Sequence, residues 1–193
     1  MKKISTILCA IAVGLLSFRV YETSLWKYDS DHAKLGFSIS HLTVTDVDGS
    51  FKDVQATIRT SKSDFSDAVA EMTAQVKSVD TDNEKRDEHL QAPDFFDATK
   101  FPTIVFKSTS FQKAAELNTY TVAGDLTLHG VTKRITLSAI ANSTIHPYTK
   151  KTVAGFKISG KINRKDFGIA PETPAAMLGE EVSVYANAEF IKE

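Results

Sequence analysis

Alternation of apolar and polar residues dominates the chain from about residue 26 to its end. Successive residues of a β-strand point to opposite faces of a sheet, so a period of two predicts strands with one buried face. Leu35, Phe37 and Ile39, for example, alternate with small or polar residues. The pattern predicts eight strands, at about residues 35–41, 49–59, 70–76, 103–107, 120–128, 131–139, 154–162 and 182–190. Residues 26–29 leave a ninth strand open.

Two segments depart from this alternation. Residues 81–84 read Thr-Asp-Asn-Glu, the Thr-x-x-Glu form of a capping box, which predicts one short helix near residues 82–91. Pro171 and Pro174 predict a long loop across residues 168–179, because proline removes a backbone donor from a strand.

Eight antiparallel strands with one apolar face each can close into a barrel or stack as a sandwich. Closure removes exposed strand edges, so we predict an all-β fold with a single eight-stranded antiparallel barrel. Such an interior is either filled by side chains or holds one small ligand. Small residues on the predicted inward faces, such as Gly124, Ala154 and Gly160, favour a cavity, but small residues also occur where strands bend.

The first residues of the chain have the composition of an export signal. Lys2 and Lys3 precede an apolar run over residues 4–18, which is shorter than the ~20 residues of a membrane span. We predict a signal peptide at residues 1–19 and one domain at 20–193, periplasmic or secreted, with no stable membrane span. An uncleaved anchor and a buried first helix are the alternatives, and no cleavage site is assigned.

Composition excludes several classes of function. The formal net charge is −1 and no run of Lys or Arg forms a basic face, which argues against a nucleic-acid partner. The single cysteine, Cys9, lies in the predicted signal, so the domain would contain no disulfide, no cysteine metal site and no cysteine nucleophile. The sequence has neither a His-x-His nor a His-x-x-x-His pair, and it has no Gly-x-Ser-x-Gly motif. We therefore predict no metal, no cofactor and no enzymatic activity.

Four longer motifs carry a resemblance to a known family. They lie at residues 31–42, 78–97, 101–109 and 122–133, with a later echo at 163–168. Taken together, Arg-Asp-x-His-Leu, Asp-Phe-Phe-Asp and Gly-Asp-Leu-Thr-Leu-His-Gly-Val-Thr-Lys resemble the YceI-like proteins. That resemblance implies a lipocalin-like barrel in the periplasm or outside the cell. It also implies a bound isoprenoid, such as a quinone tail or polyprenyl phosphate, and no catalytic step.

The apolar faces of the predicted strands supply the candidate lining of the cavity, with Phe95 added from the segment after the helix. A filled core is the alternative for each of them. The candidate lining residues are Phe37, Ile39, His41, Met72, Ala74, Val76, Phe95, Ile104, Phe106, Leu126, Ile135, Leu137, Phe156, Ile158, Val182 and Val184.

Polar groups near the predicted helix are candidates for contact with a ligand head group. Arg86, Asp87 and His89 could hold a phosphate or a quinone oxygen, because arginine donors match phosphate. Alternatively, this cluster ties the helix to the barrel. Arg164 and Asp166 are interpreted as a structural ion pair.

Three hypotheses about function follow. The first is a carrier or sequestering protein for an isoprenoid lipid, with a homodimer left open. The second is an enzyme acting on a lipid-like substrate at Arg86, Asp87 and His89. The third is a stress-related interaction protein with a packed interior and an exposed apolar patch.

Overall fold

The computed structural model describes residues 22–193. The predicted signal peptide at residues 1–19 lies outside these residues and stays a prediction. Ten strands, one α-helix and two short 3-10 helices make up the described part of the chain. The strands are β1 (Ser24–His41), β2 (Thr45–Phe51), β3 (Val54–Thr60), β4 (Val69–Gln75), β5 (Val79–Asp80), β6 (Thr103–Lys113), β7 (Thr119–Leu128), β8 (Val131–Ile145), β9 (Thr152–Asn163) and β10 (Leu178–Lys192).

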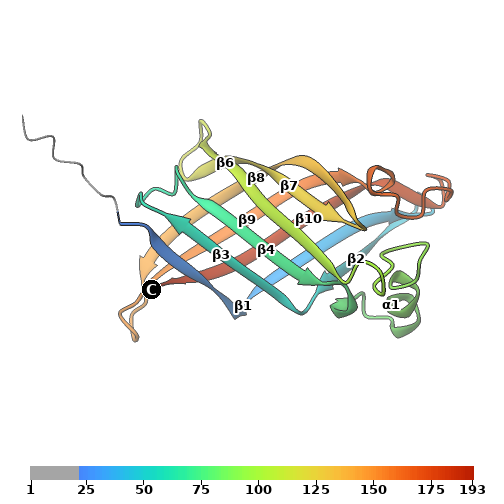
Figure 1. Ribbon diagram of the computed structural model, residues 1–193, viewed down its shortest axis with the longest axis horizontal. Coiled ribbons are helices and arrows are strands. Elements are labelled where there is room, and N and C mark those ends of the chain that lie inside the picture. The colour runs from blue at the N-terminus through green and yellow to red at the C-terminus, as the bar shows by residue number, and fades with distance from the viewer. Residues whose placement is uncertain (1–21) are drawn as a thin grey trace, which may run out of the picture.

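The strands close into an antiparallel barrel, because β10 pairs with β1 as well as with β9 (Figure 1). The barrel has eight strands rather than ten, because two pairs of short strands each act as one bent strand. β2 and β3 both lie beside β1, and β5 lies beside β2 as β4 lies beside β3. The predicted eight-stranded antiparallel barrel is confirmed.

Two strand boundaries differ from the sequence prediction. The predicted strand at 49–59 is broken at Lys52 and Asp53, where the chain bends from β2 into β3. The possible ninth strand at 26–29 is instead the first part of β1, which is 18 residues long. Both differences arise at bends, where the chain changes its pairing partner.

The tight turn between β7 and β8 is formed by His129 and Gly130. Their φ angles are 51° and 73°, so both residues are in the left-handed region that a two-residue type I′ hairpin requires. A Cβ on Gly130 would lie 2.3 Å from a ring carbon of Phe101. Glycine is therefore needed here both for its backbone conformation and for the close packing of Phe101.

The predicted helix is α1 (Glu84–Leu90), but its N-terminal cap is not the one that the sequence pattern indicated. Asn83 is the capping residue, and its side chain accepts a hydrogen bond from the backbone N–H of Arg86. Thr81 is buried and binds Asp87 instead. The 3-10 helix η2 (Arg164–Phe167) precedes the predicted long loop, which ends at Leu178.

One end of the barrel is filled by aromatic side chains. Phe65, from the loop between β3 and β4, lies with its ring centroid 5.2 Å from Trp26 and 5.1 Å from Phe156. Phe156 also contacts Phe111 and Phe190 edge to face. We call this the aromatic end, and the opposite end, which carries α1 and the loop after η2, the helix end (Figure 1).

Candidate ligand cavity

A cavity of about 240 Å³ lies inside the barrel, and its lining is almost entirely apolar. A cavity that holds one water molecule needs only ~15 Å³, so the interior is not a packed core throughout. Its floor at the aromatic end includes Phe111, Phe156 and Phe190. Leu90 and Ile169 line it at the helix end.

The cavity is elongated along the barrel. Both Leu178 and Phe190, near the two ends of β10, belong to its lining. At ~3.3 Å per residue this stretch covers roughly 40 Å of strand, or ~30 Å along the axis of a barrel with strands tilted by ~40°. A long, narrow apolar space suits a linear hydrocarbon chain better than a compact ring system.

Most of the predicted lining residues border this cavity. Their contact with a ligand stays a prediction. The predicted residues that border the cavity are Phe37, Ile39, Met72, Phe95, Ile104, Phe106, Leu126, Ile135, Leu137, Phe156, Ile158, Val182 and Val184.

Three other predicted lining residues need correction. Ala74 has 0% exposure and Val76 has 1%, and both are covered by neighbouring residues rather than by the cavity. Val76 has left the strand pattern altogether, because it begins the 3-10 helix η1 (Val76–Ser78). His41 is the last residue of β1, is exposed, and does not border the cavity. Alternation predicts on which face of a strand a side chain lies, but it does not show where along the strand the cavity ends.

The cluster around Arg86 does not border the cavity. Arg86 Nε donates to Thr81 Oγ1 at 2.7 Å, and Arg86 Nη2 donates to the Thr81 carbonyl at 2.6 Å. Asp87 Oδ1 accepts from the backbone N–H and the hydroxyl of Thr81, at 2.9 and 2.6 Å. His89 Nε2 lies 3.0 Å from Asp94 Oδ2 on the surface. These contacts fit the alternative, in which the cluster fixes the helix to the barrel, and contact of these residues with a ligand head group stays a prediction.

The same segment nevertheless contributes to the cavity through its apolar residues. Leu90, Phe95 and Phe96 all border it, and the Phe96 ring packs against Phe51 with centroids 5.8 Å apart. The polar residues of the motif therefore hold α1 in place while its apolar neighbours cover one end of the cavity.

Arg164 is a structural residue whose role the sequence did not indicate. It is 2% exposed and borders the cavity, yet the predicted pair with Asp166 is not among its contacts. All three guanidinium nitrogens donate to backbone carbonyls of the loop that closes the helix end. The accepting carbonyls belong to Gly179 at 2.9 Å, Ile169 at 3.0 Å, Thr173 at 2.8 Å, Leu178 at 3.0 Å and Ala170.

Burial lowers the pKa of Arg164 from its usual value, because desolvation disfavours the charged guanidinium. The five carbonyl oxygens offset that cost, and arginine stays protonated in proteins. Only the Asn-Arg-Lys-Asp-Phe-Gly motif could have drawn attention to this residue, and that motif does not reveal which carbonyls meet there.

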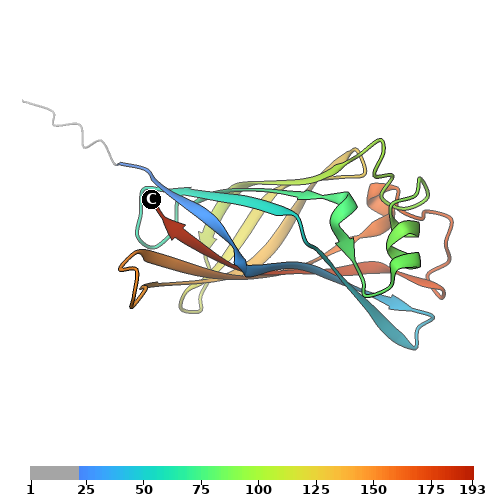
Figure 2. The same cartoon turned by 90° about the horizontal axis from the view of Figure 1, so that it is seen from below.

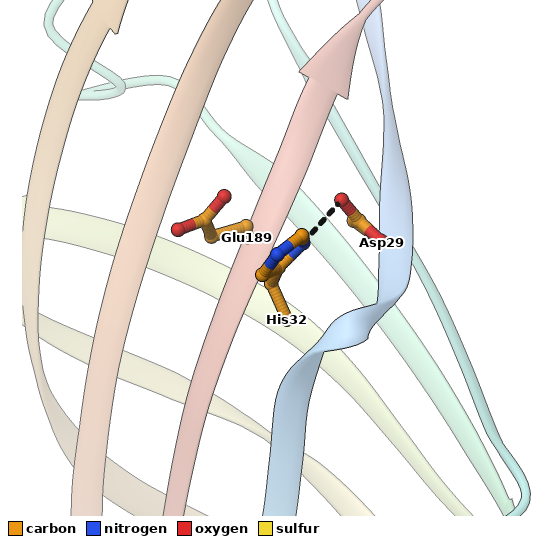
Figure 3. Close-up of side chains that lie close together, drawn as sticks. All are labelled: Asp29, His32 and Glu189. Carbon is orange, nitrogen blue, oxygen red and sulfur yellow. Dashed lines mark hydrogen bonds and ion pairs between the residues drawn. The ribbon is translucent and has the colours of Figure 1, made fainter. Parts of the chain in front are cut away.

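A second group missed by the sequence analysis lies on a bulge of β1. Residues 30–32 are inserted between the pairs Asp29–Glu189 and Ala33–Ala188, so β1 bends outward from β10 (Figure 3). His32 Nδ1 lies 3.0 Å from Asp29 Oδ2, and the ligand atoms of Asp29, His32 and Glu189 all lie within 4.8 Å of one another. Sequence spacing does not reveal this group because Glu189 is on a different strand.

Hydrogen bonding between Asp29 and His32 shifts both pKa values. It raises the pKa of His32 above 6.5 and lowers the pKa of Asp29 below 3.8. These groups are of the kinds that bind metal ions, but their hydrogen bond accounts for the arrangement without an ion. We therefore regard the group as a structural contact that holds the bulge.

The geometry defines a small antiparallel β-barrel with an elongated apolar interior, the architecture of a binding protein for apolar molecules. The chain belongs to the YceI-like family, because the YceI-like domain model matches residues 26–190. Within the part of the chain that the structure describes, no helix combines the length and the apolar character needed to cross a membrane.

Curated relatives from Staphylococcus aureus are similar over most of their length. The UPF0312 proteins SAS2572 (strain MSSA476) and SAUSA300_2620 (strain USA300) are each 36% identical over 168 residues. Each match covers 84% of this chain and 95% of the relative.

Solved structures share the fold. The Campylobacter jejuni YceI protein has a TM-score of 0.72 and 27% identity, covering 98% of this chain and 99% of the other. Burkholderia cenocepacia BcnA has a TM-score of 0.72 and 21% identity, covering 84% and 98%. A polyisoprenoid-binding domain from Saccharophagus degradans has a TM-score of 0.62 and 15% identity, covering 87% and 98%. At 21% and 15% identity, BcnA and the polyisoprenoid-binding domain show only that the fold is shared.

Proposed function

We propose that the protein binds an isoprenoid lipid, a polyprenyl phosphate or the tail of a quinone, inside the barrel. It would act outside the cytoplasm as a carrier or sequestering protein. The elongated apolar cavity inside a YceI-like barrel is the observation that carries this proposal. A polyisoprenoid-binding domain of the same fold adds support.

The energetics favour reversible binding. A tail that buries ~500 Å² of apolar surface at ~25 cal/mol per Å² gains roughly 12 kcal/mol. Ordering the chain and losing its free motion cost at least ~4–6 kcal/mol. The difference corresponds to a Kd in about the micromolar range, which allows both uptake and release.

The cavity supports binding rather than catalysis. Arg164 is a charged residue on its wall, but all three guanidinium nitrogens already donate to backbone carbonyls. Burial lowers the pKa of Arg164, but arginine stays protonated in proteins, so it is a poor proton donor or acceptor near neutral pH. The remaining lining is dominated by aliphatic and aromatic side chains, which bind apolar surface without reacting with it.

The proposal is tested by identifying the bound lipid. Organic-solvent extraction of the purified protein, followed by mass spectrometry, should release an isoprenoid. Lipid-free protein should then bind added polyprenyl phosphate or quinone at about one molecule per chain. A preparation that contains no lipid and binds neither compound would contradict the proposal.

A pair of variants on β10 tests whether the cavity is the binding site. Ala186 borders the cavity, whereas Asn187 is its exposed neighbour. Ala186→Trp should fill part of the cavity and reduce the bound lipid at least tenfold. Asn187→Trp adds the same side chain outside the barrel and should bind lipid as the native protein does. Equal binding by the two variants would place the ligand elsewhere.

A further inference from the structure

The barrel wall is interrupted between β1 and β3. β1 pairs with β3 only over Ser24–Lys27 and with β2 only over Leu35–His41. Between these two stretches, residues 28–34 of β1 share no strand pairing with residues 52–56. By contrast, β9 and β10 pair without interruption from Val153 and Ile191 to Asn163 and Glu181. Figure 2 shows β1 and β3 diverging along the barrel at this place.

The bulge of β1 lies beside this interruption. The three residues inserted at positions 30–32 bend β1, and the hydrogen bond between Asp29 and His32 spans the bend (Figure 3). A bulge changes the direction of a strand and ends its pairing locally. The separation of β1 from β3 is therefore built into the strand.

The cavity reaches the outer surface through this interruption. Its lining includes the inward-facing Ala56 and Ala70, and it also includes the outward-facing Thr57 and Glu71 of the same strands. The outward direction of Glu71 is shown by its ion pair with Lys107, at 3.6 Å between two side chains that are each more than half exposed. Residues from both faces of this strand pair border the space where β1 and β3 lose their pairing, which indicates that the space opens through the wall there. We call this passage the side opening.

The two ends of the barrel offer a head group less room. The aromatic end is filled by Trp26, Phe65 and Phe156, and the helix end is covered by Phe96 and by the loop that Arg164 holds. A polar head group could leave either end only by displacing these groups. The side opening instead joins the apolar interior to water in the present conformation.

Lys34 supplies a positive charge at the rim of the side opening. It borders the cavity, is exposed, and forms none of the ion pairs found among residues 22–193. Its charge reaches Asp80, whose pKa it helps to lower, but Asp80 is paired with Lys52 at 3.1 Å. Glu71 is likewise paired with Lys107. Asp80 and Glu71 are thus partly neutralised by their own lysine partners, and Lys34 is available to an anion.

Resting on the proposed function, we propose that the side opening is the head-group site, where Lys34 and the unpaired backbone of β1 and β3 bind the phosphate of a polyprenyl phosphate. The tail lies in the cavity and the phosphate lies between the two strands. Backbone N–H groups that lack a strand partner can donate to phosphate oxygens, as can the lysine ammonium group. The site therefore favours an anionic head group over a neutral one.

Charge variants test this preference. Binding of a polyprenyl phosphate and of the uncharged polyprenol of the same length is compared in Lys34→Gln, Lys34→Glu and Lys151→Glu. Lys151 is an exposed residue of the loop between β8 and β9, and Lys151→Glu changes the net charge by the same amount as Lys34→Glu. We expect Lys34→Gln to weaken the binding of polyprenyl phosphate by ~5- to 10-fold, the range of a charged hydrogen bond at an exposed site. We expect Lys34→Glu to weaken it further. Binding of polyprenol by every variant, and of both lipids by Lys151→Glu, should stay as in the native protein.

Thiol protection tests the position of the head group. In a Cys9→Ser chain, which has no other cysteine, Thr57→Cys places a thiol on the rim and Arg59→Cys places one two residues further along β3. Bound polyprenyl phosphate should slow the reaction of a thiol reagent with the first variant at least fivefold and leave the second unchanged.

The outcomes separate this inference from the proposed function. If the native protein binds both lipids but the Lys34 variants keep the native preference and the thiol at position 57 is not protected, the head-group site is wrong and the cavity function stands. If the native protein binds neither lipid, the proposed function itself fails.

Discussion

The two ends of this barrel are both closed by side chains from loops and strands but are built differently. At the aromatic end, rings from four strands and one loop meet directly, as Phe65 does with Trp26 and Phe156. At the helix end, a cavity separates the walls, and the cover is held by hydrogen bonds from Arg164 and around Thr81. The aromatic end gives the molecule its packed core, and the helix end gives it room for a ligand. Polar contacts thus hold the cover of the helix end in place without filling the cavity with side chains.

The largest effect is expected at the aromatic end. Phe156 is 2% exposed and contacts Phe65, Phe111 and Phe190, so Phe156→Ala should lower the free energy of unfolding by about 3–5 kcal/mol. Urea denaturation measures this change. The matched control is Phe95→Ala at the helix end, where the ring is only half-buried and about 1 kcal/mol should be lost. Equal losses at the two positions would contradict the contrast between the ends.

Arg164→Met should have the next largest effect. The substitution keeps an apolar stem but removes every donor from the carbonyls of the closing loop, with an expected loss of about 2–4 kcal/mol. Hydrogen exchange should show faster opening of residues 169–178. Lys165→Met is the control, because its ion pair with Glu180 is partly exposed and contributes less than ~1 kcal/mol. Unchanged exchange in the loop would show that the arginine does not hold it.

A smaller change in stability but a clear change in ligand kinetics is expected for Phe96→Ala. Phe96 is half-buried and covers the cavity against Phe51, so the loss of unfolding free energy should be only about 1 kcal/mol. The dissociation rate of bound lipid should rise severalfold in stopped-flow displacement experiments. If lipid dissociates from Phe96→Ala at the same rate as from the native protein, the ligand does not contact the cover of the helix end.

The smallest effect concerns the bulge of β1, which belongs to neither end. NMR titration should place the pKa of His32 above 6.5, because Asp29 stabilises its protonated form. The charged pair is complete between the lowered pKa of Asp29 and the raised pKa of His32. The contribution of this pair to stability is lost as pH rises through the pKa of His32 and as pH falls through the pKa of Asp29. In Asp29→Asn the His32 midpoint should fall toward 6.5, and an unchanged midpoint would contradict the contact.

Sequence patterns predicted much of the fold because strand alternation is a local property. The strands at 120–128 and 131–139 and the short helix near residues 82–91 lie where they were predicted, and the predicted apolar residues of β6 to β9 face the interior. The errors at Ala74 and Val76 have one cause. A strand pattern does not show where a strand gives way to a 3-10 helix or where neighbours cover it.

The candidate site was less predictable, because it depends on contacts between distant segments. Arg86 and Asp87 have the composition of an anion site, but in the structure both side chains form hydrogen bonds with Thr81. Lys34 gave no signal in the sequence, because its importance comes from the separation of β1 and β3.

The sequence by itself determined where most of the strands lie and which of their side chains share the apolar face, because alternation and turn chemistry act over a few residues. Closure into a barrel depends on the pairing of β1 with β10, which are far apart in the chain. Tertiary structure alone decided that the inward side chains meet at one end and stand apart at the other. Phe65 enters from a loop to fill the aromatic end, while the bulge at residues 30–32 separates β1 from its neighbour. Packing depends on the distance between strands, and that distance is set by bends and loops far apart in the chain.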